Sequence, residues 1–207
     1  MKNILRILMS ALLILAVSCS NQDEVVSPDS EGTLSLKVLT DTRAQDSGSD
    51  LSYLIRIYNS EGLIRKYTSL EELPSTLALL AGDYTIKVQV GEQVAASFKE
   101  KFYLGEQTFT IVGGQKSDVE VVCRLQNAVV AVNYDQSVVD AFEAGFGTKV
   151  SLGEASLNYT TSAQGYFSPT EELKLASWSF SGNHPSKGAL SQSGELTLES
   201  GKRYTLN

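Results

Sequence analysis

Residues 82–91 read GDYTIKVQVG, and this stretch carries the pattern that decides the fold. Apolar side chains stand at every second position, at Tyr84, Ile86, Val88 and Val90. Because successive side chains of a β-strand point to opposite faces, these four would lie together on one buried face. Gly82-Asp83 supplies a turn before the strand, and Gly91 ends it. The stretch therefore predicts a strand with one face in a core and the other in solvent.

The same alternation continues on both sides of this strand. It recurs at Leu34, Leu36 and Val38, at Leu51, Tyr53, Ile55 and Ile57, and at Val119, Val121, Cys123 and Leu125. Further strand signals occupy residues 63–69, 75–82, 97–104, 108–114, 148–153, 155–161, 173–182, 188–194, 194–200 and 202–207. Turn residues such as Pro74, Gly105 and Gly113-Gly114 separate them. Many short strands with turns between them predict an all-β fold of two antiparallel β-sandwich domains, at residues 33–126 and 127–207.

One short helix is expected in the second domain, at residues 137–147, SVVDAFEAGFG. Ser137 and Asp140 stand in capping-box spacing, and Gly145 or Gly147 can close the C-terminus. Its apolar side is made of Val138, Val139, Phe142 and Phe146. Such a short helix is expected to pack over a sheet edge.

Residues 173–182, LKLASWSFSG, depart from simple alternation. Leu173 and Leu175 occupy odd positions, whereas Trp178 and Phe180 occupy even ones. A β-bulge between the two pairs would turn the aromatic side chains to the other face. A strand buried on both faces is the alternative explanation.

Two stretches resemble a family of Bacteroidetes-type surface lipoproteins that is assigned only as a domain of unknown function. They are LPSTLALLAGDYTIKVQVGE, residues 73–92, and FYLGEQTFTIVGGQKSDVEVVCRLQNAVVAVNY, residues 102–134. More distantly, the chain resembles the fimbrillin pilins and fimbrillin-like adhesins, and the similarity is best over residues 32–145. The resemblance implies a transthyretin-like or immunoglobulin-like sandwich and a role at the cell surface.

The first residues have the order of a secretory signal. Lys2 and Arg6 precede an apolar run at residues 7–17, and a small residue stands just before Cys19. The apolar run is too short for a membrane span, which takes about 20 residues. We therefore expect residues 1–18 to be a signal peptide and Cys19 to carry acyl chains such as palmitate.

Residues 19–32 are polar and acidic and predict a lipidated tether before the first strand. The expected location is the outer membrane, anchored by lipid, and the resemblance implies that Asp23 and Glu24 favour export to the cell surface. Ala16 stands where the usual lipobox has Leu. A plain secreted protein without lipid is the alternative.

The chain is acidic, and removal of the signal makes it more so. Its formal charge is −7, and the loss of Lys2 and Arg6, the charged residues before Cys19, makes it −9. No basic face is available for phosphates, so nucleic acid is not an expected partner, and membrane contact would rest on the acyl chains of Cys19. Cys123 is the remaining cysteine, which leaves no disulfide within the mature chain, and its place in the alternation predicts a buried side chain.

No residue pattern reaches the level of a catalytic site. His184 is the sole histidine, and no Gly-x-Ser-x-Gly elbow precedes a helix. A zinc site needs about four ligands, and the cysteine and histidine content is too low to supply them. The acidic pairs Glu71-Glu72 and Glu171-Glu172 lie in polar segments beside prolines and indicate solvated turns rather than glycosidase carboxylates. We expect a protein that is not an enzyme and has no cofactor or metal.

Two functions from different classes remain. The first is cell adhesion, as an adhesin or an accessory pilus subunit, with other surface or pilus subunits as partners. The second is a glycan-binding surface lipoprotein, in which exposed aromatic residues stack on sugar rings. Trp178, Tyr166 and Phe167 are the candidates, near turns expected at Gly165 and Pro169. Core packing is the alternative role for Trp178.

Arg43 and Ala44 follow the first predicted strand and form a candidate processing site. The resemblance to fimbrillin pilins implies cleavage here by an arginine-specific protease, which would release the first strand and open a groove for a strand from another chain. The alternative is that Arg43 is an ordinary solvated loop residue.

Overall fold

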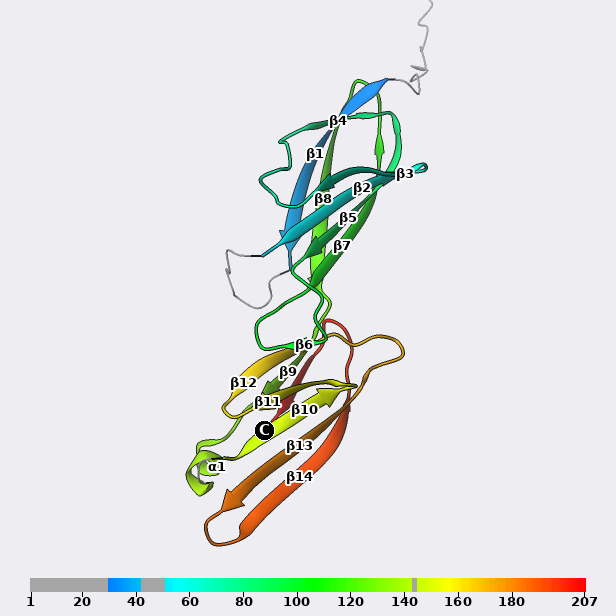
Figure 1. Cartoon of the computed structure of the whole chain (residues 1–207). Coiled ribbons are helices and arrows are strands. Elements are labelled where there is room, and N and C mark those ends of the chain that lie inside the picture. The colour runs from blue at the N-terminus through cyan, green and yellow to red at the C-terminus, as the bar shows by residue number, and fades with distance from the viewer. Residues whose placement is uncertain (1–29, 42–50, 143–144) are drawn as a thin grey trace, which may run out of the picture.

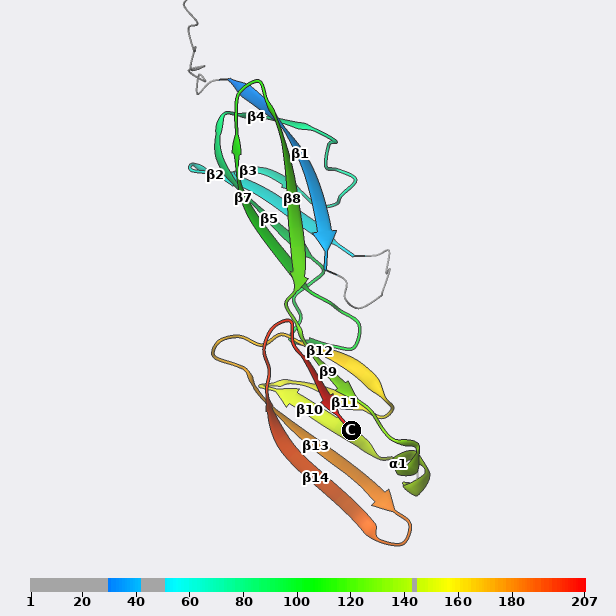
Figure 2. The same cartoon turned by 180° about the vertical axis from the view of Figure 1, so that it is seen from behind.

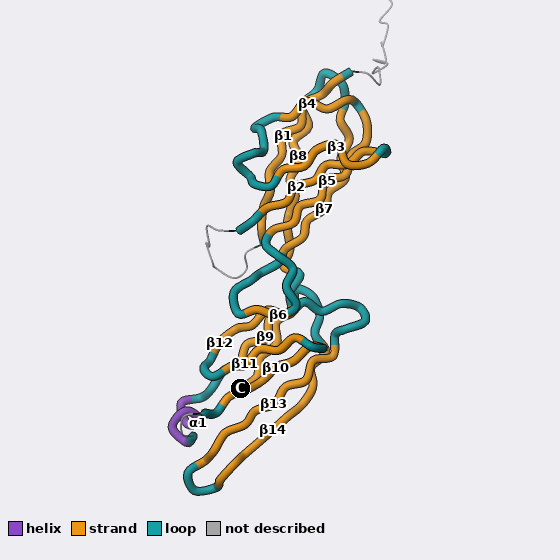
Figure 3. The backbone as a smooth tube through the Cα atoms, viewed as in Figure 1, coloured by secondary structure: helices purple, strands orange, loops and turns teal. Residues whose placement is uncertain are grey.

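The computed structural model describes residues 30–41, 51–142 and 145–207. These residues form fifteen strands and one short helix, as the sequence predicts for an all-β chain (Figures 1 and 3). The elements are β1 (Glu31–Thr40), β2 (Tyr53–Asn59), β3 (Gly62–Tyr67), β4 (Leu77–Leu80), β5 (Gly82–Val90), β6 (Ala96–Ser97), β7 (Tyr103–Ile111), β8 (Lys116–Leu125), β9 (Ala128–Val132), α1 (Gln136–Ala141), β10 (Gly147–Leu152), β11 (Ala155–Tyr159), β12 (Ala163–Phe167), β13 (Leu175–His184), β14 (Gly188–Thr197) and β15 (Arg203–Leu206). The helix is much too short to cross a bilayer, and the described residues contain no other.

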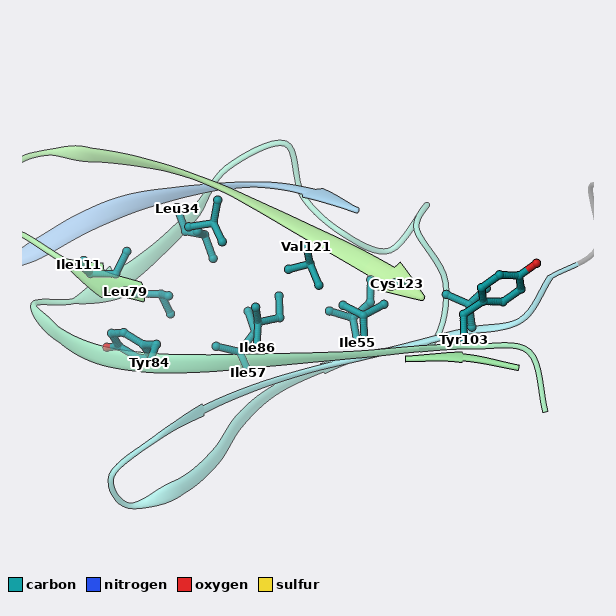
Figure 4. Close-up of a cluster of buried hydrophobic side chains, with 13 residues drawn as sticks. Leu34, Ile55, Ile57, Leu79, Tyr84, Ile86, Tyr103, Ile111, Val121 and Cys123 are labelled. Carbon is teal, nitrogen blue, oxygen red and sulfur yellow. The ribbon is translucent and has the colours of Figure 1, made fainter. Parts of the chain in front are cut away.

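The first half of the chain folds one continuous sheet back onto itself. The strand order is β3-β2-β5-β7-β8-β1-β4. Between β7 and β8 only Tyr103 with Leu125 and Leu104 with Arg124 are paired. The two strands then diverge, so that β8, β1 and β4 face β7, β5, β2 and β3 across a core (Figure 4). The result is a sandwich whose two layers share one corner.

The alternating apolar residues of β5 lie in this core, as predicted. Buried residues of β5 are Tyr84, Ile86, Val88 and Val90, and they meet Val119, Val121 and Cys123 of β8. Figure 4 shows the β5 and β2 side chains pointing toward those of β1 and β8. Gly82 has a φ of +152°, which glycine adopts without strain. Gly82 does not close a hairpin, because β4 and β5 are not paired with each other. β4 pairs with β1 in one layer, whereas β5 pairs with β2 and β7 in the other, so the chain crosses between the layers at Gly82.

The second half has two separate four-stranded sheets with a second core between them. Their orders are β11-β10-β13-β14 and β15-β9-β12-β6. All five residues of β9 are buried, and Ala128, Val130 and Val132 belong to the core cluster that also contains Val150, Tyr159 and Phe167. The two halves lie end to end, with α1 and the long β13–β14 hairpin at the end away from β4 (Figures 1 and 2).

The sandwiches are not purely antiparallel, in contrast to the prediction. β1 pairs in parallel with β8 from Thr33–Lys116 to Thr40–Cys123, and β15 pairs in parallel with β9. In each half the first strand pairs with the last strand, and the two run in the same direction because the first strand starts at one end of the sandwich and the last strand finishes at the other. The remaining pairs are antiparallel.

Three glycines expected at turns or strand ends lie inside strands, for a common reason. A Cβ on Gly105 of β7 would come within 2.8 Å of Val121 Cγ1, and one on Gly165 of β12 would meet the Tyr159 hydroxyl. Gly194 of β14 lies beneath the ring of Trp178. In each case a neighbouring side chain fills the space that a Cβ would need. In place of the predicted strand at 97–104 the structure has β6 and the start of β7, which continues through Gly105. The predicted strands at 188–194 and 194–200 form the single strand β14, which continues through Gly194. β12, which contains Gly165, was not predicted.

The β-bulge predicted in residues 173–182 is absent. β13 pairs with β10 and β14 in unbroken register from Leu175 to His184. Ala176, Trp178 and Phe180 face inward, whereas Leu175 is 55% exposed on the outer face. The strand is therefore not buried on both faces either. The change of phase reflects two exposed leucines, Leu173 before the strand and Leu175 at its start, and not a change of backbone.

The helix forms near its predicted place but is capped differently. Asp135 is the N-cap, and its carboxylate accepts a hydrogen bond from the Ser137 backbone N–H at 2.9 Å. The Ser137–Asp140 capping box is therefore wrong, as is closure by a glycine, because α1 ends at Ala141 and Phe142 continues in extended backbone. Because Asp135 bonds to the Ser137 N–H and hydroxyl, the pKa of its carboxyl is lowered.

Candidate ligand-binding groove

A cavity of about 330 Å³ lies in the second half, between the β13–β14 hairpin, α1 and the chain end at β15. We call it the hairpin groove. Its lining residues lie on or beside six elements, β9, α1, β10, β13, β14 and β15, and are Val132, Asn133, Tyr134, Val138, Phe142, Thr148, Trp178, Phe180, Gln192, Thr205, Leu206 and Asn207. The groove exists because β14 and β15 are the outer strands of their two sheets, so the sandwich stays open along this side.

Aromatic rings form one wall of the groove and hold one another in place. The ring centroids of Phe142 and Phe180 are 5.3 Å apart in an edge-to-face arrangement, and those of Tyr134 and Phe146 are 5.1 Å apart. Phe142 also meets the His184 ring edge-to-face at 5.9 Å. Edge-to-face pairs are the favoured geometry for aromatic rings, so the cluster fixes the position of Phe180.

Tyr134 connects this wall to the core. Its hydroxyl donates to the backbone carbonyl of Tyr159 at 2.9 Å and lies 2.8 Å from the hydroxyl of Thr148. Its backbone N–H donates to Ser162 Oγ at 2.8 Å. The Tyr134 hydroxyl is therefore occupied inside the protein, and only the ring is left to face the groove.

Trp178 is half-buried, with part of its side chain on the second core and part in the groove. Its partner across the hairpin is Gly194. A Cβ at position 194 would come within 2.8 Å of the indole Nε1. The absence of a side chain there lets the indole lie flat against β14, and both roles expected for Trp178, core packing and ligand contact, remain compatible with this position.

Amide side chains form the polar rim. Asn133 Nδ2 donates to Asn207 Oδ1 at 3.1 Å, which ties the end of β9 to the residue after β15. Gln192 on β14 is exposed, and its amide has no hydrogen-bond partner among the residues that the structure describes. An amide offers both donors and acceptors, so this rim can bind groups that do the same.

None of the described residues that line the groove is Asp, Glu, Lys or Arg. The nearest formal charges on α1 are carboxylates, at the N-cap Asp135 and at Asp140, which accepts a hydrogen bond from Gln136. The lowered pKa of Asp135 keeps that carboxylate charged at neutral pH. The described side chains of the groove are therefore uncharged, and two carboxylates lie next to them.

The other aromatic residues expected to contact a glycan are not in the groove. Phe167 is fully buried in the second core, and Tyr166 is 7% exposed, with Lys101 Nζ 5.4 Å from its ring centroid. Both lie on β12, in the opposite sheet from Trp178, and not at a turn. The expectation of exposed stacking surfaces is wrong for these two residues.

Sequence reasoning missed Tyr134, Phe142 and Gln192 as groove residues. Phe180 could have been found, because it stands two positions after Trp178 and so shares its face. Gln192 is one polar residue among several exposed ones on β14, and only the pairing of β13 with β14 places it beside Phe180. Nothing in the local sequence shows that α1 brings Phe142 to the hairpin.

Three of the predicted site residues, Cys19, Arg43 and Ala44, lie outside the described residues. Of the acidic pairs, Glu72 serves its own loop, because its carboxylate accepts a hydrogen bond from the Thr68 N–H at 2.6 Å. His184 Nδ1 accepts from the Ser186 N–H at 3.2 Å. Within residues 30–41, 51–142 and 145–207 no group of three His, Cys, Asp or Glu is placed to hold a metal ion.

Comparison with known proteins assigns the chain to a family. Residues 12–207 match the family described as a domain of unknown function, DUF4493, and the chain belongs to this family. The match extends beyond the residues 32–145 over which the resemblance was best. No curated protein matches the chain in sequence.

Several solved structures are similar to the chain. The chain is similar to a candidate cell adhesion protein from Bacteroides eggerthii, with 10% identity, a TM-score of 0.46, and coverage of 87% of this chain and 86% of that one. It is similar to a candidate polysaccharide-binding protein from Bacteroides thetaiotaomicron, with 8% identity, a TM-score of 0.46, and coverage of 81% and 80%. The fimbrial anchor protein Mfa2 from Porphyromonas gingivalis has 10% identity, a TM-score of 0.36, and coverage of 81% and 83%.

Proposed function

We propose that this chain is a lipid-anchored adhesion protein of the outer membrane surface, with fimbrillin-like architecture and no enzymatic activity. The observation that carries the proposal is the position of the hairpin groove. β1, the first strand after the predicted tether, begins at one end of the molecule, and the groove lies in the other half (Figure 1). A protein held at its N-terminus would present such a groove away from the membrane.

The anchor in this proposal is the acylated Cys19. Two or more acyl chains hold a protein at a bilayer where a single chain binds only reversibly. Possible binding partners are other surface proteins, pilus subunits or glycans. The second candidate function, a glycan-binding lipoprotein that takes no part in a fibre, is favoured by the position of Trp178 in the groove.

The chain offers a matched pair of cysteines for testing the anchor. We expect Cys19→Ala to move the protein out of the detergent phase on detergent partitioning, because no other acylated residue would hold it. Cys123→Ala, which removes the buried thiol of β8, is the control and should partition like the unaltered chain. If the Cys19→Ala protein still enters the detergent phase, the lipid anchor is wrong.

The adhesive role is tested on whole cells. Cells that display the chain should attach to epithelial or bacterial cell layers in greater numbers than cells that lack it or carry Cys19→Ala. Cells with Cys123→Ala should attach normally. Equal attachment of all four kinds of cell would reject the adhesive function.

A further inference from the structure

We infer that the hairpin groove binds an uncharged carbohydrate, with one sugar ring lying on Trp178 and its hydroxyl groups held by the rim amides. This inference deepens the proposed function, since it names the ligand class of the same groove. It is carried by the joint presence, in one cavity, of aromatic faces, amides with unused donors and acceptors, and uncharged side chains among the described lining residues.

The aromatic wall suits one face of a sugar. A pyranose ring presents several C–H groups on a face, and these carry a small positive charge that is attracted to the negative face of an aromatic ring. Trp178 has the largest such face, and Phe180 lies two residues along the same side of β13. A sugar on this wall would cover apolar surface and would leave its hydroxyls directed toward the rim.

The rim suits the hydroxyls. Each sugar hydroxyl is both a donor and an acceptor, and an Asn or Gln amide is the side chain that offers both. Gln192 has no hydrogen-bond partner among the described residues, while Asn133 and Asn207 use one donor and one acceptor on each other and retain the rest. Asn133 and Asn207 lie together after β9 and β15, and Gln192 lies on β14, so the rim offers amides at two places.

The charges in and around the groove determine which sugars can bind there. The described residues of the lining include no Lys or Arg that could pair with a carboxylate or a sulfate. Asp135 and Asp140 at α1 would repel an anionic ligand, and burying an unpaired charge costs several kcal/mol. Acidic sugars such as sialic acid and uronic acids are therefore excluded by the same site that accepts neutral ones.

Size indicates how much of a glycan is bound. A volume of about 330 Å³ is at the lower end for a small-molecule site. Such a space holds the terminal part of a glycan and leaves the rest in solvent. Contacts within the protein hold the wall in place, since Phe142 packs against Phe180 and the space above Gly194 is filled by Trp178.

Trp178 is the only tryptophan of the chain, so its fluorescence reports on the groove directly. The test is a titration of the full chain, in a detergent without a sugar headgroup, with lactose, cellobiose and mannobiose, and with sialyllactose and digalacturonic acid as the acidic set. We expect a saturable change in emission with at least one neutral disaccharide at millimolar concentration and none with the acidic set. Because no ion pair is involved, added salt should leave the affinity unchanged.

Two variants connect the signal to the groove. Gln192→Ala should weaken binding about fivefold, as expected for the loss of one hydrogen bond. Gln107→Ala, an exposed glutamine on β7 of the other sandwich, is the matched control and should bind normally. No emission change with any neutral sugar, a change with acidic sugars alone, or equal affinity in Gln192→Ala would each overturn the inference.

The results separate the inference from the proposed function. If cells attach but no neutral sugar binds, the groove ligand is of another class, such as a protein segment lying along β14, and only the carbohydrate inference fails. If a neutral sugar binds but the cells do not attach, the carbohydrate inference stands and the adhesive function fails.

Discussion

Asn127 is a buried polar residue at the point where the two halves of the molecule meet. It has no exposed surface, and its Oδ1 accepts a hydrogen bond from the Phe102 N–H at 2.7 Å. Its Nδ2 donates to Ser168 Oγ at 3.1 Å, and that hydroxyl in turn donates to the Val94 carbonyl at 2.6 Å. One amide thus connects three segments that are distant in sequence.

Asn127→Ala is expected to lower the free energy of unfolding by about 1–3 kcal/mol, because it leaves the buried Phe102 N–H without an acceptor. Urea unfolding followed by circular dichroism measures the change. Asn133→Ala is the control, since Asn133 is exposed and bonds only to Asn207 through its side chain, and it should change stability little. Equal midpoints for both variants would show that the Asn127 contacts contribute nothing.

Cys123 is fully buried, and this burial raises the pKa of its thiol to about 11. Since the thiolate is the reacting form, native protein should react with iodoacetamide at neutral pH far more slowly than urea-unfolded protein, as mass spectrometry would record. Rapid labelling of the native chain would contradict the packing of β8.

The same raised pKa has a defined effect on stability. The neutral Cys123 thiol makes its full contribution to the free energy of unfolding below the pKa of the unfolded thiol, which is about 8.5. This contribution is lost as the pH rises through about 11. Burial also raises the pKa of Tyr53 and Tyr84, so the whole protein loses stability in the same alkaline range. Between about pH 8.5 and about pH 11, the free energy of unfolding should therefore fall less in Cys123→Ala than in the unaltered chain.

Strands could be predicted from the sequence wherever one face is buried, because burial imposes a period of two. That rule located the core positions of β5 and β8. It failed at Gly105, Gly165 and Gly194, because a glycine at a turn and a glycine under a neighbouring side chain look the same in one sequence. The groove could not be predicted from one sequence either, because it is assembled from β9, α1, β10, β13, β14 and β15, which only the fold brings together.

The β13–β14 hairpin allows a test of the space beneath Trp178. Gly194→Val would place side-chain atoms where the indole lies, and it should push Trp178 toward solvent. We expect a red shift of the tryptophan emission and a loss of groove binding with little unfolding. Ser193→Val, one position away and on the opposite face of β14, should leave the emission unchanged. An unshifted spectrum for Gly194→Val would contradict the described position of the indole.

The two halves of the molecule have separate cores but are not joined by a single linker. β6 lies within the first predicted domain, yet it pairs with β12 in the second half, Tyr166 with Ser97 and Phe167 with Ala96. The stretch between β5 and β7 therefore crosses to the second sandwich and returns. A fragment ending at residue 126 would carry β6 without its partner strand, which a boundary drawn from sequence alone does not reveal.

The proposed processing at Arg43 is a prediction about the whole molecule. β1 lies between β8 and β4, so its removal would expose the backbone edges of both strands and the core beneath Leu34. We expect an arginine-specific protease to cut after Arg43, and the cut chain to form oligomers on size-exclusion chromatography as a strand from another copy fills the space. Mass spectrometry verifies the cut, and Arg43→Lys should resist it. A cut chain that stays monomeric with β1 bound would exclude strand exchange.

The parallel pairing of β1 with β8 has a mechanical consequence. A load applied between the start of β1 and the second half pulls these two strands along their length in opposite directions, because β1 starts at the outer end and β8 leads into β9. The hydrogen bonds from Thr33 to Thr40 then resist the load together instead of opening one after another. Resistance to forced unfolding is set by the rate of unfolding rather than by equilibrium stability. If a cell is held by this protein in flowing liquid, the drag on the cell would act along the length of β1 and β8. In that direction their hydrogen bonds must break together, so the two strands separate slowly.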